Sequence, residues 1–172
     1  MRKKYRQVQS ILYIHALAVL LLSGAIASAQ TGSDELTRMV AAYELTLPRI
    51  EAYGAVMSEL ADWAAARPKE AQAMRDRAPK GPATVEQSAA AVEREPAVKA
   101  LFDKHKLTGR EFVLIPTAVM QARIAAMGEA QGRTFPADKI NPKNTALAKA
   151  NGPRIDAIMR KVAEDRTRAF GR

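Results

Sequence analysis

Apolar residues recur at three- and four-residue steps along almost the whole chain, and no segment alternates polar and apolar residues as a strand does. One clear stripe follows Thr46 and consists of Ile50, Tyr53, Met57, Leu60 and Ala64. A wider one follows Thr108 and consists of Phe112, Ile115, Val119 and Ala122, with Met120, Ile124 and Met127 beside it. The pattern predicts an all-α fold whose central helix begins near Thr108.

Capping and proline signals divide this pattern into separate helices. We predict helical segments beginning at Asp34, Thr46, Pro68, Thr84, Pro96, Thr108, Pro142 and Pro153. Thr84 with Gln87 and Thr108 with Glu111 fit capping boxes, and Thr46 is also a good N-cap residue. Leucines 45 and 107 precede two of these caps, where each can pack onto an apolar residue of the first helical turns.

Three further features shape the second half of the chain. Pro116 removes a hydrogen bond inside the central helix, so we predict a kink there, which either opens a cavity or fits the helix around its neighbours. Residues 128–142 form an irregular connection, and Asn151-Gly152 stop a short helix before the last one. On that last helix we predict two i,i+4 ion pairs, Asp156–Arg160 and Glu164–Arg168.

The first 29 residues have the composition of a secretory signal peptide. A basic head (Arg2, Lys3, Lys4 and Arg6) precedes an apolar run over residues 11–22, and Ala27-Ser28-Ala29 forms an A-x-A cleavage site. We predict cleavage between Ala29 and Gln30, and a periplasmic or secreted protein. Retention as an anchor is the alternative, since residues 11–29 approach the ~20 residues that a membrane-spanning helix needs.

Cleavage leaves residues 30–172, which suit one helical domain. Four of the 27 basic residues and none of the 18 acidic ones precede residue 30, so the net charge falls from +9 to +5. This charge and export both argue against a nucleic-acid partner, and we expect no membrane insertion after cleavage. The sequence thus predicts a single domain with the architecture of an up-and-down helical bundle and additional short helices.

The chain contains no cysteine, which excludes disulfides, thiolate metal sites and covalent attachment of c-type haem. It also lacks a Walker loop and the G-x-G-x-x-G, G-x-S-x-G and H-E-x-x-H motifs. No catalytic residue, cofactor or metal ligand is therefore predicted.

An enzyme would have to use Glu44, Glu51 or His105, the one histidine after residue 30. Glu44 and Glu51 stand with Tyr43 and Tyr53 near one helix junction, and their spacing is typical of no mechanism or metal site. His105 lies before a helix start, where we interpret it as a solvated connector residue.

Two other sets of residues could form binding surfaces. Met57, Met120, Met127 and Met159 could line an adaptable groove, but each lies on an apolar stripe, so we assign them to the core. Arg154, Lys161 and Arg168 share a helix face and could contact an anionic lipid or polysaccharide. Acidic residues interleave with them, which favours a solvated face instead.

Three segments carry a resemblance to known proteins: Leu-Thr-x-Pro-x-Ile at 45–50, Leu-Thr-x-Arg-Glu-Phe-Val-Leu at 107–114, and Asn-Thr-Ala-Leu-Ala-Lys-Ala-Asn at 144–151. In this order they resemble a group of small, uncharacterised, exported helical bacterial proteins, which implies a fold and an address but no activity. The two Leu-Thr starts also resemble the repeated Leu-Thr-x-x-Gln motif of Spy-like periplasmic chaperones. Arg49 and Glu111 stand here where that motif has glutamine.

Together these features predict a non-catalytic protein of the bacterial cell envelope that binds a protein or an apolar ligand. The alternatives are a periplasmic chaperone-like protein, as the second resemblance implies, and an enzyme that uses Glu44, Glu51 or His105.

Overall fold

A computed structural model describes residues 30–79, 81 and 83–170, and the predicted signal peptide over residues 1–29 lies outside this range. The described residues form helices and contain no strand, which confirms the all-α prediction. The helices are α2 (Gln30–Ala42), α3 (Leu47–Ala66), α4 (Pro68–Arg77), α5 (Val85–Glu93), α6 (Pro96–His105), α7 (Gly109–Glu129) and α8 (Pro142–Phe170).

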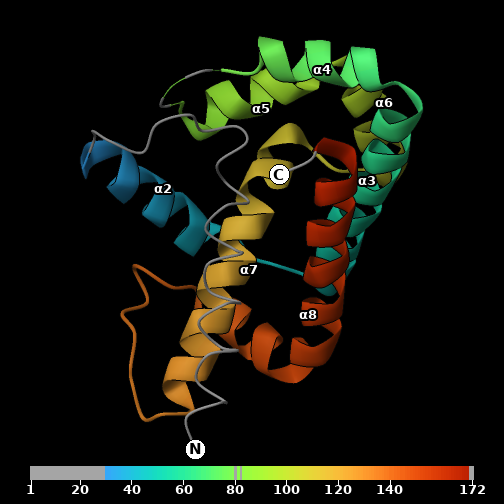
Figure 1. Ribbon diagram of the computed structural model, residues 1–172. Helices are drawn as coiled ribbons and strands as arrows, with labels where there is room; N and C mark the ends of the chain where they lie inside the picture. The colour runs from blue at the N-terminus through green and yellow to red at the C-terminus, as the bar shows by residue number, and fades with distance from the viewer. Residues whose placement is uncertain (1–29, 80, 82, 171–172) are drawn as a thin grey trace, which may run out of the picture.

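The three longest helices form the centre of the molecule. Helix α8 packs most extensively against α3 and then against α7, while α5 covers α7 and α6 covers α3. In Figure 1, α3 and the second part of α8 run side by side in the same direction, and α7 runs the opposite way. Helix α2 lies apart from this centre and contacts mainly α7.

The apolar stripes predicted from the sequence meet in one core. Ile50, Val56, Ile115 and Ile155, from the three long helices, are almost fully buried. The ring of Phe112 lies 5.2 Å from that of Tyr53 and 5.1 Å from that of Phe102, so aromatic contacts join α7 to α3 and α6. Such tilted ring pairs stabilise a core beyond the area that they bury.

Two of the three predicted caps have the expected side-chain bonds. Thr84 with Gln87 and Thr108 with Glu111 form complete capping boxes at the starts of α5 and α7. Thr46 occupies the N-cap position of α3, but its side chain makes no capping hydrogen bond. Pro48, near the start of this helix, has no N–H of its own to be capped, so one of the usual donors is missing there.

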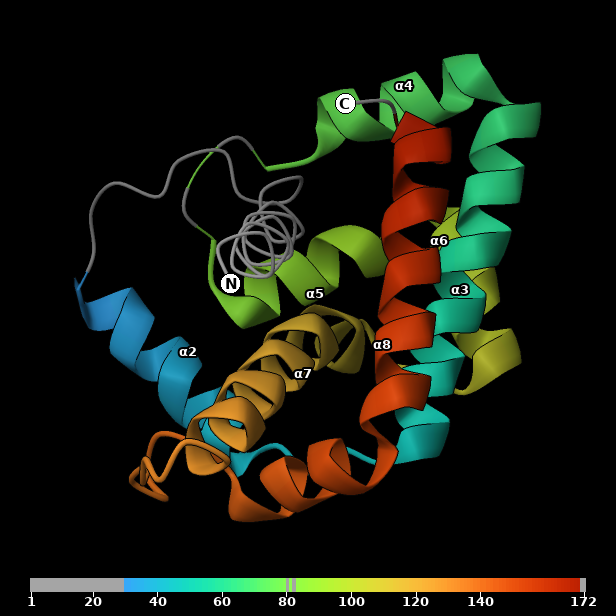
Figure 2. The same ribbon diagram turned by 60° about the horizontal axis from the view of Figure 1, so that its bottom comes forward.

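The irregular features of the second half are reproduced in part. Helix α7 continues through Pro116 to Glu129, and the irregular connection then covers residues 130–141. The predicted stop at Asn151 is a break inside α8, since Asn151 has non-helical angles of φ −123° and ψ 17°. Figure 2 shows the two parts of α8 at a steep angle, with the first lying across one end of the molecule.

The predicted ion pairs on α8 are replaced by other pairs, one within α8 and two that join it to neighbouring helices. Asp156 bonds Arg123 of α7 at 2.6 Å rather than Arg160. Arg168 bonds Asp165 at 3.0 Å and Asp62 of α3 at 2.8 Å rather than Glu164. Tertiary packing brought Arg123 and Asp62 within reach, and sequence spacing does not contain that information.

The link between α2 and α3 is fixed to the start of α8 by a buried asparagine. Asn144, only 3% exposed, accepts the Leu45 N–H at 2.8 Å and donates to the Tyr43 carbonyl at 2.8 Å. Asn141 donates to the same carbonyl at 3.3 Å. These bonds satisfy the backbone of a non-helical stretch and thereby fix the base of α2.

Candidate functional site

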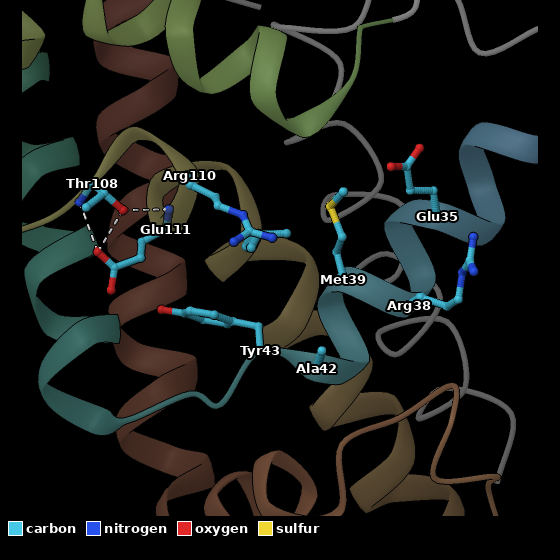
Figure 3. Close-up of a pocket in the computed structure, with 9 residues that line it drawn as sticks. Glu35, Arg38, Met39, Ala42, Tyr43, Thr108, Arg110 and Glu111 are labelled. Atoms are coloured by element: carbon cyan, nitrogen blue, oxygen red, sulfur yellow. Dashed lines mark hydrogen bonds between the residues drawn. The ribbon is translucent and has the colours of Figure 1, made fainter.

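An open cavity of about 660 Å³ lies between α2 and the first turns of α7. Its walls are formed by Glu35, Arg38, Met39, Ala42 and Tyr43 on one side and by Thr108, Arg110, Glu111 and Leu114 on the other. Figure 3 shows the two groups of side chains on either side of the opening, with the Tyr43 ring between them. The volume is within the ~300–1,000 Å³ typical of small-molecule sites.

The α7 wall of the cavity is fixed by the Glu111 carboxylate, whose two oxygens both have partners. Glu111 Oε2 accepts the N–H of Thr108 and its hydroxyl, each at 2.9 Å. Glu111 Oε1 lies 3.2 Å from Nε of Arg49, which also donates to the Lys106 carbonyl. The carboxylate charge is therefore neutralised, and the two residues that depart from the Leu-Thr-x-x-Gln motif are partners of each other.

Tyr43 provides a buried polar atom in the cavity wall that has no protein partner. Its hydroxyl oxygen is buried and has no hydrogen bond among the described residues. Desolvation, and secondarily the Glu111 charge, raises the pKa of Tyr43 to about 12, although Arg49 acts in the opposite direction. The hydroxyl therefore stays protonated at neutral pH and can donate to an acceptor that the protein does not supply.

A second, smaller hollow of about 240 Å³ lies where α4 meets α6. Trp63 and Pro96 contribute apolar surface, and Arg77 crosses it to bond Glu95 at 2.9 and 2.6 Å. That ion pair lowers the pKa of Glu95 and uses both carboxylate oxygens. The hollow thus contains no described polar side chain comparable to the unpartnered hydroxyl of Tyr43.

The structure places Glu44, Glu51 and His105 in three separate contacts. Glu44 bonds Lys143 at 2.7 Å, and Glu51 bonds Arg154. His105 Nε2 lies 2.9 Å from Oε1 of Glu59, which is eight residues beyond Glu51 on α3, a distance of about 12 Å along a helix. The geometry therefore does not bring the three residues together.

His105 is the last residue of α6 and is partly buried, so the interpretation as a solvated connector is wrong. Its partner Glu59 also accepts two bonds from Lys104, at 2.8 and 2.7 Å. The bond to Lys104 and the bond to His105 lower the pKa of Glu59. This cluster joins α6 to α3 at the surface.

The methionines divide between core and surface. Met57 and Met159 are buried, as predicted, and Met120 is half-buried. Met127 is 43% exposed, so its assignment to the core is wrong, and its neighbour Ile124 is 39% exposed. Ala125, Ala126 and Gly128 around them are buried, so Ile124 and Met127 lie on a face of α7 that the other helices leave uncovered.

The basic face of α8 consists of ion-paired side chains. Arg154 bonds Glu51, Lys161 bonds Asp165 at 2.7 Å, and Arg168 bonds Asp62 and Asp165. These pairs support the solvated face over a lipid or polysaccharide contact, because each charge already has a partner.

No cluster of three or more potential metal-ligating residues occurs in the described part of the chain. Over the same residues, no helix combines the length and the apolar character required to cross a bilayer. Searches with the whole sequence and structure, against protein-family models, curated proteins and solved structures, found no match. The assignment of the candidate site therefore depends on the geometry of the described residues alone.

In the sequence, Tyr43 and Glu111 stand out as separate features, and Arg38 and Arg110 were not identified as site residues. Their α2 and α7 segments are separated by more than sixty residues, and only packing brings them together. One local signal was available: an aromatic residue at a helix end with charged residues near it.

Proposed function

We propose that this protein is a non-catalytic binding protein of the bacterial cell envelope, with the α2–α7 cavity as the site of an apolar or amphiphilic ligand. In this proposal residues 1–29 are a signal peptide that is removed after Ala29, and the remaining helices form a bundle of the up-and-down type.

The observation that carries the proposal is the mixed character of the cavity. Met39, Ala42 and Leu114 supply apolar surface, and the Tyr43 hydroxyl is a buried donor without a partner. Ligand sites commonly combine apolar walls with a few polar groups that fix orientation.

The chemistry of the lining supports binding over catalysis. General acid–base catalysis needs a group whose pKa lies near the working pH. Tyr43 has a pKa raised to about 12, and both Glu111 oxygens already have partners. The Thr108 hydroxyl lies beside the Glu111 carboxylate, but this pair forms the capping box of α7, and both Glu111 oxygens already have partners.

A neutral apolar fluorophore, N-phenyl-1-naphthylamine, tests the proposal. Its fluorescence should rise on adding the exported protein, and Ala42→Trp should abolish the rise by filling the cavity. Ala150→Trp, an exposed position on α8 away from the cavity, is the matched control and should bind like the wild type. Equal binding by the two variants would place the ligand elsewhere, and no binding by the wild type would overturn the proposal.

The chaperone-like alternative is favoured by a different observation, the exposure of Ile124 and Met127 on α7. Exposed apolar side chains can hold unfolded clients, and methionine adapts to varied partners. Suppression of the aggregation of a reduced, unfolding client would measure this activity. Ile124→Lys with Met127→Lys should abolish it if the alternative holds, whereas Ala42→Trp should leave it unchanged.

A further inference from the structure

The charged residues of the cavity indicate what kind of ligand it takes. Arg38 lines it from α2 and Arg110 from α7, and Figure 3 shows Arg110 reaching into the space beside Tyr43. Arg110 has a single weak partner, Glu86 at 4.0 Å, and both side chains of that pair are more than half exposed. Arg38 pairs with no carboxylate within the described residues.

The negative charges nearby do not cancel these two arginines. Glu111 is already neutralised by Arg49 and saturated by Thr108. Glu35 and Arg38 are both exposed, and Figure 3 shows both beyond Met39 along α2, away from Tyr43, so Glu35 offsets Arg38 and leaves Arg110 without a counterion in the cavity. Arg38 and Arg110 therefore outnumber Glu35, the one lining carboxylate that Arg49 does not neutralise. The excess charge of the cavity is positive.

The Tyr43 hydroxyl, like the two arginines, favours a ligand with a strong hydrogen-bond acceptor. The Tyr43 hydroxyl is buried without an acceptor, and a buried donor that lacks a partner is destabilising. A carboxylate oxygen is a strong acceptor for a phenolic O–H and for a guanidinium. An alcohol could satisfy Tyr43 but would leave the arginine charges without a counterion.

We propose that the ligand of this cavity is an aliphatic carboxylate, whose chain lies against Met39, Ala42 and Leu114 and whose head group pairs with Arg110. A turn of the Tyr43 ring toward the opening brings its buried hydroxyl, which has no protein acceptor, to the same head group. Arg38 contributes charge at the opposite wall. This inference depends on the proposed binding function and narrows it to one class of amphiphile.

Three probes with the same chain and different head groups test the inference: decanoate, decanol and decylamine, each below its micelle-forming concentration. Displacement of N-phenyl-1-naphthylamine gives their dissociation constants. For the wild type we expect decanoate to bind at least about tenfold more tightly than decanol, and decylamine to bind most weakly.

Variants then assign the preference to residues. Arg110→Gln with Arg38→Gln should reduce the preference for decanoate over decanol to about twofold or less, while decanol binding stays the same. Tyr43→Phe should weaken decanoate binding by about tenfold or more, which corresponds to the loss of one hydrogen bond to a charged group. Arg94→Gln changes an exposed arginine outside the cavity and should behave like the wild type.

The outcomes separate the two proposals. Equal affinity for decanoate and decanol in the wild type would overturn the carboxylate inference and leave the apolar site in place. The same holds if the double arginine variant keeps the full preference. If neither the fluorophore nor any of the three probes binds, the proposed function fails together with the inference.

Discussion

At the scale of single residues, the two Leu-Thr helix starts differ although their sequences resemble each other. Thr108 caps α7 with a full capping box, whereas the Thr46 side chain makes no capping bond to α3. The leucines before both caps are buried, at 5% for Leu45 and 4% for Leu107. Both starts therefore anchor an apolar residue, but only one threonine contributes a hydrogen bond.

Thr108→Ala should consequently lower the free energy of unfolding by about 1 kcal/mol, the usual cost of losing an N-cap. For a domain of this size that is a fall of roughly 2–4 °C in melting temperature. Thr46→Ala should cost clearly less, because no capping bond is lost. Thermal unfolding of the two variants measures the difference, and equal losses would contradict this account of the caps.

Gly109 marks the closest approach of two helices at the start of α7. A Cβ added there would lie 2.8 Å from the Ala89 carbonyl oxygen of α5, and the Gly109 N–H donates to Glu93 at 2.7 Å. Backbone cannot give way as a flexible side chain can, so the residue has to be small.

We expect Gly109→Ala to destabilise the protein by about 1–3 kcal/mol, the common cost of overpacking. Gly81→Ala is the matched control, because a Cβ at that position would meet nothing within 4 Å. Chemical denaturation of both variants tests the prediction. A Gly109→Ala protein as stable as the control would mean that α5 and α7 can separate at little cost.

At the scale of elements, the position of α2 depends on its link to α8. Asn144 bonds both Tyr43 and Leu45, so a side chain about a hundred residues away fixes the direction in which α2 leaves the core. The cavity lies between α2 and α7, and its shape therefore depends on this contact.

Asn144→Ala should leave the buried Leu45 N–H without a partner, at a cost of about 1–3 kcal/mol. Hydrogen exchange over α2 and residues 43–46 should become faster, and binding of the fluorophore should weaken. Asn151→Ala is a suitable control, since Asn151 donates only to Leu147 of its own helix. Unchanged exchange in α2 after Asn144→Ala would show that α7 alone holds that helix.

At the scale of the whole molecule, a buried carboxylate connects the two helices with the largest mutual contact. Asp165 is 5% exposed and accepts bonds from Ser58 at 2.5 Å, Lys161 at 2.7 Å and Arg168 at 3.0 Å. Desolvation raises the pKa of this carboxyl, but the bonds from Lys161 and Ser58 outweigh it and hold the pKa below the ordinary 3.8.

A depressed pKa in the folded state gives a stabilisation that is complete above the unfolded value of 3.8 and is lost as the pH falls through the folded value. Asp165→Asn should therefore cost about 1.5–3 kcal/mol near neutral pH, the contribution of hydrogen bonds to a charged group. The gap between variant and wild type should narrow at about pH 3. Urea denaturation at both pH values tests this, and a gap independent of pH would contradict it.

The proposed export also concerns the whole chain. Because the A-x-A site ends at Ala29, the exported protein should begin at Gln30, and N-terminal sequencing measures this directly. A protein that begins at Met1 and is extracted only by detergent would instead be anchored by residues 11–29.

The sequence by itself determined the helices and most of their ends. Helical periodicity, the capping boxes at Thr84 and Thr108 and the break at Asn151 are local properties, because each depends on residues within one or two turns of each other. The sequence also determined that the main apolar stripes are buried, because an amphipathic helix turns its apolar face toward the core wherever it packs.

Only the tertiary structure decided which charged groups meet and where the cavity lies. Arg123 bonds Asp156, Arg49 bonds Glu111 and Asn144 bonds Leu45, and each pair joins segments far apart in the chain. Likewise, Met127 is exposed because it lies on a face of α7 that the neighbouring helices leave uncovered, although its sequence stripe is apolar. Such contacts depend on how helices pack and cross, and the spacing of residues within one helix does not contain that information.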